Sequence, residues 1–238
     1  MLAEGSVAAV RLTIPHWFDF GEDRVHVGDD LVRAAAWDAL RLNTDGPFSV
    51  PATRAAWEEA AADRPEIRAR AERIVDLARE RGVRRIASYG AGAAVLELWM
   101  KRTAPEIELI LTDYAEGANA RVAAIFPEAQ VVRHDLLTDP PLDADLHLFH
   151  RIDTELTNRQ WRAVLRRFAR VPVLVAATEV IGLDRALTEI ARRLRVRNLS
   201  RAGWLRTRPA FEAIYGAEHE ITPLRLVDLD GWMLEPRR

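Results

Sequence analysis

The chain has 238 residues, 49% of them hydrophobic and 29% charged, with a formal net charge of -2, which is ordinary for a globular protein with one large core. It has no cysteine, which excludes disulfides, thiolate-zinc sites and cysteine nucleophiles. No apolar run approaches the roughly 20 residues of a membrane span, and residues 1–18 lack the features of a secretion signal, so we expect a cytoplasmic protein without membrane contact.

Residues 1–82 are predicted to form an N-terminal cap and helices. The first 50 residues are rich in aromatic residues, glycine, proline and aspartate, which indicates a partly irregular segment. A helix is expected over residues 49–61. A second helix is expected with Asp63 as its cap and Pro65 in its first turn, and Gly82 is its natural end.

Residues 83–238 are predicted to form a second domain, because strand-like and helix-like segments alternate there. This alternation is typical of βαβ units and of a parallel sheet covered on both faces. The predicted strands are 84–89, 107–112, 129–134, 144–150 and 171–180. The predicted helices are 93–103, 116–125, 157–170 and 183–195. Two β-like runs flank Asp230 and Gly231, a hairpin turn signal, so we expect the last strand to run antiparallel to its neighbour.

A glycine turn follows the first of these strands, in the sequence IASYGAGAAVLE of residues 86–97. In an open parallel sheet, ligands bind beyond the carboxyl ends of the strands. A residue without Cβ, such as Gly90 or Gly92, lets a ligand approach the backbone closely. The position indicates a nucleotide-like cofactor, and the alternative is a plain tight loop.

Two aspartates end the next two strands. Asp113 can accept hydrogen bonds from both hydroxyls of a ribose, and Tyr114 can pack on an adenine face. Asp135 can accept from an adenine amino group, beside the backbone N–H of Leu136. Taken singly, Asp113 is equally a helix cap and Asp135 a loop residue. Their order after the glycine turn favours a cofactor site.

With these motifs, residues 83–236 resemble the class I S-adenosylmethionine-dependent methyltransferases. The resemblance rests on SYGAGA, LTDY, HDLL, the strands ADLHLFHRI and VPVLVAATEV, and the closing hairpin. It implies a doubly wound α/β fold, with a seven-stranded, mostly parallel sheet whose last strand is antiparallel, and S-adenosyl-L-methionine as the cofactor. The chain departs from the family at Ser88, where an acid is usual, and at Ala94, where a third glycine is usual.

The resemblance also implies which residues contact the cofactor. In the family the first-strand motif contacts the methionine part, the second-strand acid holds the ribose, and the third motif contacts the adenine. Carried over, the cofactor-binding residues are Tyr89, Gly90, Ala91, Gly92, Asp113, Tyr114, Asp135, Leu136 and Phe149.

The tip of the fourth strand faces the methyl group in the family, and here it is polar, with His147, His150, Arg151, Asp153 and Glu155. His150 is the candidate catalytic base, because imidazole has the only unperturbed pKa near neutrality; its alternative role is structural. Arg151 and Asp153 are candidates for binding substrate, and Asp153 is equally suited to orient His150 or cap the next helix. The spacing of His150, Asp153 and Glu155 does not specify a metal, so none is expected.

Four residues of the N-terminal segment, His16, Trp17, Phe18 and Phe20, are candidates for a lid over the crevice, with His16 and Trp17 binding substrate. The alternative for such aromatic residues is a place in the core. The arginine-rich segment 191–208 is expected to be a solvated helix end and loop. Because the net charge is slightly negative and no other basic patch accompanies it, a nucleic-acid partner is not favoured.

The predicted function is methyl transfer from S-adenosyl-L-methionine to an oxygen or nitrogen of a small-molecule substrate. The main alternative is a protein of the same fold that binds this cofactor, or its product S-adenosylhomocysteine, without methyl transfer. A nicotinamide oxidoreductase fits less well, because its glycine pattern requires glycine where this chain has Val95. The oligomeric state is left open, a homodimer included.

Overall fold

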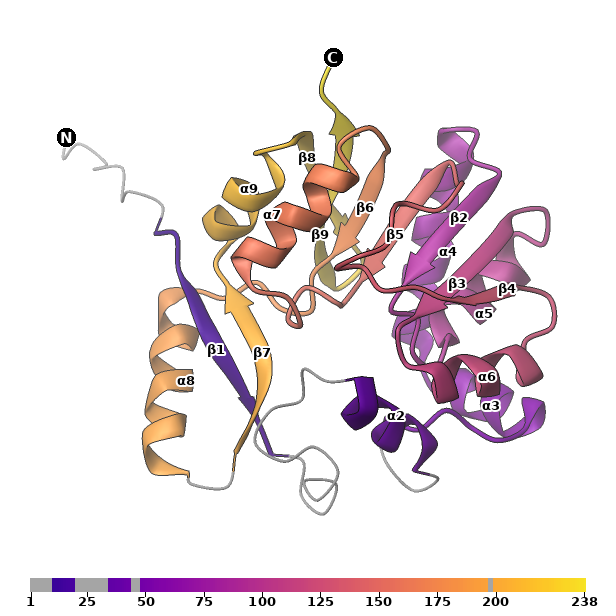
Figure 1. Ribbon diagram of the computed structural model, residues 1–238, viewed down its shortest axis with the longest axis horizontal. Helices are drawn as coiled ribbons and strands as arrows, with labels where there is room; N and C mark the ends of the chain where they lie inside the picture. The colour runs from indigo at the N-terminus through magenta and orange to yellow at the C-terminus, as the bar shows by residue number, and fades with distance from the viewer. Residues whose placement is uncertain (1–9, 20–33, 44–47, 197–198) are drawn as a thin grey trace.

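The computed structural model describes residues 10–19, 34–43, 48–196 and 199–238 (Figure 1). Its strands are β1 (Thr13–Phe18), β2 (Arg85–Tyr89), β3 (Glu108–Asp113), β4 (Gln130–Arg133), β5 (Leu146–His150), β6 (Val173–Ala176), β7 (Ser200–Arg206), β8 (His219–Leu226) and β9 (Leu229–Pro236). Its helices are α2 (Ala34–Leu42), α3 (Arg54–Ala62), α4 (Pro65–Glu80), α5 (Val95–Thr103), α6 (Glu116–Ile125), α7 (Asn158–Arg167), α8 (Leu183–Arg195) and α9 (Arg208–Tyr215).

Within the described residues, the large sheet has seven strands in the order β4-β3-β2-β5-β6-β9-β8. The strands from β4 to β6 are parallel, and β9 runs antiparallel to both β6 and β8. This arrangement confirms the predicted doubly wound α/β fold with a reversed last strand. The sheet order and strand directions are those of the class I methyltransferase fold.

Alternating side chains of the central strands build a core on each face of the sheet. Ile86 and Leu148 belong to the core that α3, α4, α5 and α6 cover, whereas Ala87 and Phe149 belong to the core under α7 and α9. Figure 1 shows these two groups of helices on opposite sides of the sheet. Burial on both faces explains why the strands are apolar without polar alternation.

Two predicted helix starts need correction. Helix α3 begins at Arg54, because the Thr53 hydroxyl accepts a hydrogen bond from the Ala56 N–H at 3.3 Å and caps it, so the helix does not start at Ser49. Asp63 ends α3 instead of capping α4, and Arg64 takes the cap position without a side-chain bond. The predicted place of Pro65 in the first turn is confirmed.

The closing hairpin is confirmed, but its turn lies three residues earlier than predicted. Val227 and Asp228 join the two strands, and Val227 has a positive φ of 59°. Asp230 and Gly231 lie inside β9. A Cβ on Gly231 would lie 2.8 Å from the Val175 carbonyl oxygen, so this glycine permits close strand pairing and makes no turn.

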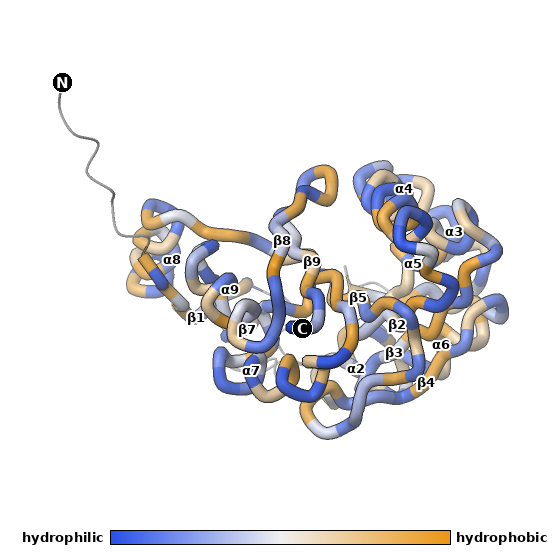
Figure 2. The backbone as a smooth tube through the Cα atoms, turned by 90° about the horizontal axis from the view of Figure 1, so that it is seen from above, coloured by the Kyte–Doolittle hydropathy of each residue, from blue (hydrophilic) through white to orange (hydrophobic). Residues whose placement is uncertain are grey.

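A second, two-stranded sheet within the described residues pairs β1 antiparallel with β7 and was not predicted. Ile14 and Leu205 pair across this sheet. They share a small core with Ala186 of α8 and with Ile181, which lies just before α8. Figures 1 and 2 both place β1, β7 and α8 together, at the end of the molecule opposite α3. We call this group the outer ribbon. The outer ribbon contains residues from both predicted domains, 1–82 and 83–238. The boundary between these two domains stays a prediction.

The described part of the chain contains no helix whose length and apolar character would allow it to cross a membrane.

Candidate functional site

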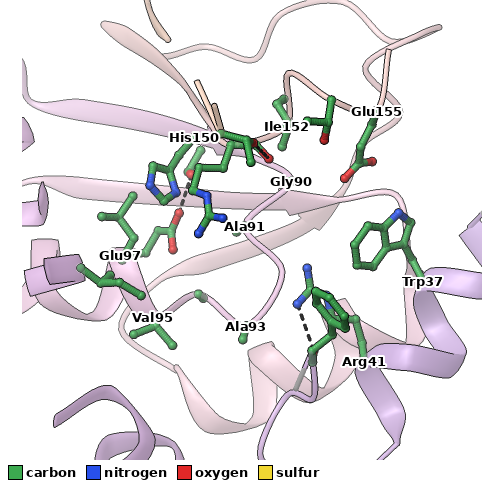
Figure 3. Close-up of a pocket in the computed structure, with 18 of the residues that line it drawn as sticks. Trp37, Arg41, Gly90, Ala91, Ala93, Val95, Glu97, His150, Ile152 and Glu155 are labelled. Carbon is green, nitrogen blue, oxygen red and sulfur yellow. Dashed lines mark hydrogen bonds between the residues drawn. The ribbon is translucent and has the colours of Figure 1, made fainter. Parts of the chain in front are cut away.

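A crevice of about 370 Å³ opens beyond the carboxyl ends of β2 and β5. The glycine turn, the start of α5 and the segment from β5 to α7 form most of its wall, and α2, Phe48, the start of α4, Thr178 and the outer ribbon also contribute to it. Of the predicted site residues, His16, Gly90, Ala91, His150 and Arg151 line it. In the view of Figure 3, His150 and Glu97 lie on one side of Gly90 and Ala91, and Glu155, Trp37 and Arg41 lie on the other.

The glycine turn has the backbone that its sequence indicates. Gly90 and Gly92 have φ values of 69° and 56°, and the Ala91 N–H donates to the Thr112 carbonyl at 3.0 Å. A Cβ on Gly90 would lie 2.5 Å from Cγ2 of Ile152. Ala94, in place of the third glycine, has a φ of 53°, a conformation that is strained for a residue with a side chain.

Asp113 is hydrogen-bonded directly to the glycine turn. Its carboxylate accepts from the Gly92 N–H at 3.3 Å and from the Ala115 N–H at 3.1 Å. Burial raises the pKa of Asp113, and these N–H donors oppose that rise. The predicted pairing of this acid with the turn is therefore present, although neither Asp113 nor Tyr114 lies in the crevice wall.

Arg41 of α2, which the sequence analysis missed, covers the second glycine. A Cβ on Gly92 would lie 2.5 Å from Nη2 of Arg41, and Nη1 donates to the Phe48 carbonyl at 3.0 Å. The positive charge of Arg41 interacts with Asp113 and Glu155. No local pattern indicates this position, because α2 reaches the turn only through the tertiary fold.

The predicted adenine-binding residues form a tight loop after β4. Asp135 accepts a hydrogen bond from the Leu137 N–H at 2.8 Å, as a turn aspartate does. Leu136 packs against the core under α7 and α9, and its carbonyl accepts from Arg167. Neither residue lies in the crevice wall.

The Tyr89 and Phe149 side chains point into the core under α7 and α9, away from the crevice, so the predicted contact of these two residues with the cofactor stays a prediction for their backbone atoms. Tyr89 is 1% exposed, and its hydroxyl lies 3.0 Å from Nδ1 of His147 and accepts from the Leu142 N–H. Strand alternation gives the reason: Ser88, one residue earlier, takes the crevice side.

His150 reaches the crevice from the end of β5, and its Nε2 has no hydrogen-bond partner among the described residues. Burial, together with the charges of Arg151 and Arg70, lowers the pKa of His150 to about 3. The argument from an unperturbed pKa near neutrality is therefore wrong. His150 is a neutral hydrogen-bond acceptor at pH 7.

The two acids that follow differ in environment. Asp153 is 1% exposed, and its carboxylate accepts from the backbone N–H and the hydroxyl of Thr178 at 2.6 and 2.7 Å, so its contact with substrate stays a prediction. Glu155 lines the crevice. Burial and the nearby Asp113 raise the pKa of Glu155 to about 8, while Arg41 opposes the rise.

A second carboxyl group, missed by the sequence analysis, lies beside the strand position that lacks its usual acid. Glu97 in the first turn of α5 lines the crevice, is 2% exposed and accepts a hydrogen bond from the Ser88 hydroxyl at 2.5 Å. Burial raises the pKa of Glu97 to about 7. The signal was present in the sequence as an acid at the otherwise apolar start of the predicted helix.

The predicted lid residues divide between two environments. His16 and Phe18 line the crevice. Trp17 does not, because its ring stacks 4.5 Å from Cζ of Arg193 and its backbone N–H donates to Glu189 of α8. The substrate contact of Trp17 therefore stays a prediction, and Phe20 lies outside the described residues.

The arginine-rich segment is only partly a solvated surface. Arg206 is fully buried and donates to the carbonyl of Asp153, the carbonyl of Leu156 and Oδ1 of Asn158. Arg206 therefore connects the end of β7 to the segment after β5 through hydrogen bonds. No group of three or more histidine, aspartate and glutamate side chains suited to a metal ion occurs in residues 10–19, 34–43, 48–196 and 199–238.

No protein-family model matches the chain, and no curated protein is significantly similar to it in sequence. Solved structures are similar in fold. Human N-acetylserotonin methyltransferase in complex with SAM is 15% identical, with a TM-score of 0.53 over 66% of this chain and 48% of that chain. An O-methyltransferase family protein from Burkholderia thailandensis is 14% identical, with a TM-score of 0.55 over 92% of this chain and 64% of that chain. TnmH is 19% identical, with a TM-score of 0.58 over 85% of this chain and 58% of that chain.

The chain thus spans about half to two thirds of the length of these structures. At these identities the similarity shows the class I methyltransferase fold.

Proposed function

We propose that this protein transfers a methyl group from S-adenosyl-L-methionine to an oxygen or nitrogen atom of a small molecule. The observation that carries the proposal is the glycine turn at the carboxyl edge of a methyltransferase sheet, with Asp113 bonded to Gly92 at 3.3 Å. When bound, the cofactor supplies a methyl group on a cationic sulfur, so the protein has mainly to bind and align the acceptor.

For this cofactor we assign the two ribose hydroxyls to the carboxylate of Asp113, and the amino-acid end to the backbone of the turn at Gly90 and Ala91. The contact of Asp113 with the glycine turn, through the Gly92 N–H, supports this assignment. We propose that Tyr114, Asp135 and Leu136 contact the adenine of the cofactor. The backbone of Tyr89 and that of Phe149 are proposed to lie near the cofactor behind these residues. The Arg41 side chain lies against Gly92, so it has to change its position when Asp113 binds a ribose.

The acceptor is proposed to be flat and aromatic. Phe18, Trp37 and Phe48 line the crevice and contact one another edge to face, with ring centroids 6.2 Å apart for Phe18 and Phe48 and 5.9 Å for Trp37 and Phe48. Such rings pack on other aromatic groups in offset or T-shaped arrangements. The Burkholderia structure, which is named as an O-methyltransferase family protein, supports an oxygen acceptor.

Two side chains are candidates for taking the acceptor proton. A general base works best when its pKa lies near the working pH. Glu155, with a pKa of about 8, meets this condition better than His150, with a pKa of about 3. We therefore assign proton removal to Glu155, and to His150 a hydrogen bond that its unpartnered Nε2 accepts from the substrate and that orients the substrate. Arg151, which lines the same crevice, is proposed to bind the substrate.

Binding without methyl transfer is a second candidate function, and the low pKa of His150 is the observation that favours it. The cytoplasmic location and the homodimer also stay predictions. Light scattering on the purified protein tests the homodimer.

The test of methyl transfer is formation of S-adenosylhomocysteine from S-adenosyl-L-methionine with a panel of hydroxylated and aminated aromatic compounds. We expect turnover with at least one of them, strong loss in Glu155→Gln, and no loss in Glu220→Gln, an exposed acid of β8. A pH profile that rises through about pH 8 in the unaltered protein supports Glu155 as the base. Cofactor binding without product from any acceptor would favour the second candidate.

A further inference from the structure

The wall of the crevice holds a carboxyl group that the fold does not need. Glu97 is 2% exposed, and among the described residues it takes part in no salt bridge. Its carboxyl group accepts a hydrogen bond from the Ser88 hydroxyl. Burying an unpaired carboxylate is unfavourable, and a glutamine or an apolar residue would fill the same space at lower cost.

The position of this carboxyl group is informative. The resemblance to the methyltransferases implies an acid at residue 88 on β2, where this chain has serine. Glu97 approaches the same point from α5, because its Oε1 lies 2.5 Å from the Ser88 oxygen. Figure 3 shows Glu97 below His150, facing the Gly90 and Ala91 side of the crevice. An acid is therefore present at the strand position, supplied by the helix.

A buried carboxylate that faces a crevice recognises a cation that can donate hydrogen bonds. Ammonium groups do so, and hydrogen bonds between charged partners are the strong ones. Arg64 and Arg151 line the same crevice, but among the described residues neither forms a salt bridge with Glu97. The sequence neighbours of Glu97 in the wall, such as Val95, carry no donor side chain. The amino-acid end of S-adenosylmethionine carries such an ammonium group.

We propose that Glu97, oriented by Ser88, replaces the missing strand acid and binds the α-ammonium group of the cofactor. This inference rests on the proposed function and adds to it a residue on α5 that holds the amino-acid end. Ser88 is a positioning residue, since its hydroxyl acts on the ligand only through Glu97.

The test is a calorimetric comparison of two ligands in two proteins. S-adenosylhomocysteine has the ammonium group, whereas 5′-methylthioadenosine has the same nucleoside and thioether without the amino-acid end. We expect Glu97→Gln to weaken S-adenosylhomocysteine by roughly 10- to 100-fold, as loss of a charged hydrogen bond does, and to leave methylthioadenosine within about threefold. Unchanged affinity for S-adenosylhomocysteine, or equal weakening of both ligands, overturns the proposal.

A double variant separates binding from folding. Ser88→Asp combined with Glu97→Gln returns the acid from the helix to the strand, so we expect it to recover most of the lost affinity for S-adenosylhomocysteine. A purely structural role for Glu97 predicts no such recovery. Should the unaltered protein bind neither ligand, the proposed function fails together with this inference. Binding of methylthioadenosine in every variant, combined with unchanged affinity of Glu97→Gln for S-adenosylhomocysteine, isolates a failure of the Glu97 proposal alone.

Discussion

The carboxyl edge of the large sheet and the outer ribbon both supply side chains to one crevice, yet they are built from contacts of different range. At the sheet edge, Asp113 binds Gly92, 21 residues away. In the outer ribbon, the Leu12 N–H donates to the Thr207 hydroxyl, 195 residues away, and the Trp17 N–H donates to Glu189, 172 residues away. The proposed cofactor-binding residues are concentrated in the short-range part, and the long-range part contributes His16, Phe18 and Ala202 to the crevice wall.

The largest predicted effect is on the ribbon. Arg206→Met removes three hydrogen bonds from a fully buried guanidinium to two carbonyls and Asn158. We expect a loss of about 3–5 kcal/mol in the free energy of unfolding, because buried acceptors lose their donors. Urea unfolding measures it, with Arg166→Met as the control, since that side chain is 72% exposed and should change stability by less than about 0.5 kcal/mol. Equal midpoints for the two variants would contradict the role of Arg206.

The two regions each contain a buried glutamate, and their replacement should have opposite effects on stability. Burial raises the pKa of Glu97 to about 7, so ionising Glu97 destabilises the folded state increasingly from about pH 4.5 to above pH 7. Glu97→Gln is therefore expected to stabilise the protein by up to about 3 kcal/mol at pH 8, and to have little effect near pH 4.5.

Glu189 in the ribbon is the counterpart. Burial raises its pKa, but the Trp17 N–H, Arg185 and His16 outweigh burial, so the pKa of Glu189 lies below its usual value. Its stabilising contribution is present at neutral pH and is lost as the pH falls below about 4.5. Glu189→Gln is expected to cost about 1–3 kcal/mol at pH 8 in thermal unfolding. A loss of stability in both variants would contradict a binding role for Glu97.

Two glycines with similar backbones sharpen the description of the sheet edge. Gly82 and Gly90 have φ values of 66° and 69°, but a Cβ on Gly82 meets no atom within 4 Å, whereas one on Gly90 lies 2.5 Å from Ile152. We expect Gly82→Ala to cost about 1–2 kcal/mol from backbone strain alone. Gly90→Ala should cost about 1–3 kcal/mol more because of crowding, measured by urea unfolding. Equal losses would show that Ile152 simply moves aside.

The smallest effect concerns Ala94, whose φ of 53° suits glycine. Ala94→Gly relieves this strain but adds freedom to the unfolded chain, so we expect a net gain between about 0 and 1 kcal/mol. Thermal unfolding measures it. A clear loss of stability would mean that the Ala94 methyl group contributes more by packing in the core than its backbone costs.

The same contrast explains what could be predicted from the sequence. The strands β2 to β6 and the glycine turn follow from local β-propensity and residue spacing, and all were predicted within a few residues. The pairing of β1 with β7 was not predicted, because the two strands lie far apart in the chain and each strand alone is short. Trp17 and Phe18 are neighbours, and only the register with β7 and the packing on α8 decides which of them faces the crevice.

Burial sets the other limit. The sequence placed His150 at the strand end, but the burial that lowers its pKa to about 3 comes from elements distant in the chain. The same holds for Arg41, which reaches Gly92 through the packing of α2. The proposed role of Glu97 could have been predicted from the sequence. Glu97 lies in the glycine-turn segment of residues 86–97, and its partner Ser88 stands where the family usually has an acid.

The central claim is that the glycine turn and Asp113 hold an S-adenosyl cofactor, and calorimetric titration tests it most directly. We expect S-adenosylmethionine and S-adenosylhomocysteine to bind the unaltered protein in the micromolar range and NADH not to bind. Asp113→Asn keeps an acceptor for only one of the Gly92 and Ala115 N–H groups, which bond to different carboxylate oxygens, and it removes the negative charge, so it should weaken both ligands by roughly 10- to 100-fold. Absence of binding by both S-adenosyl ligands, or binding of NADH in their place, would contradict the account.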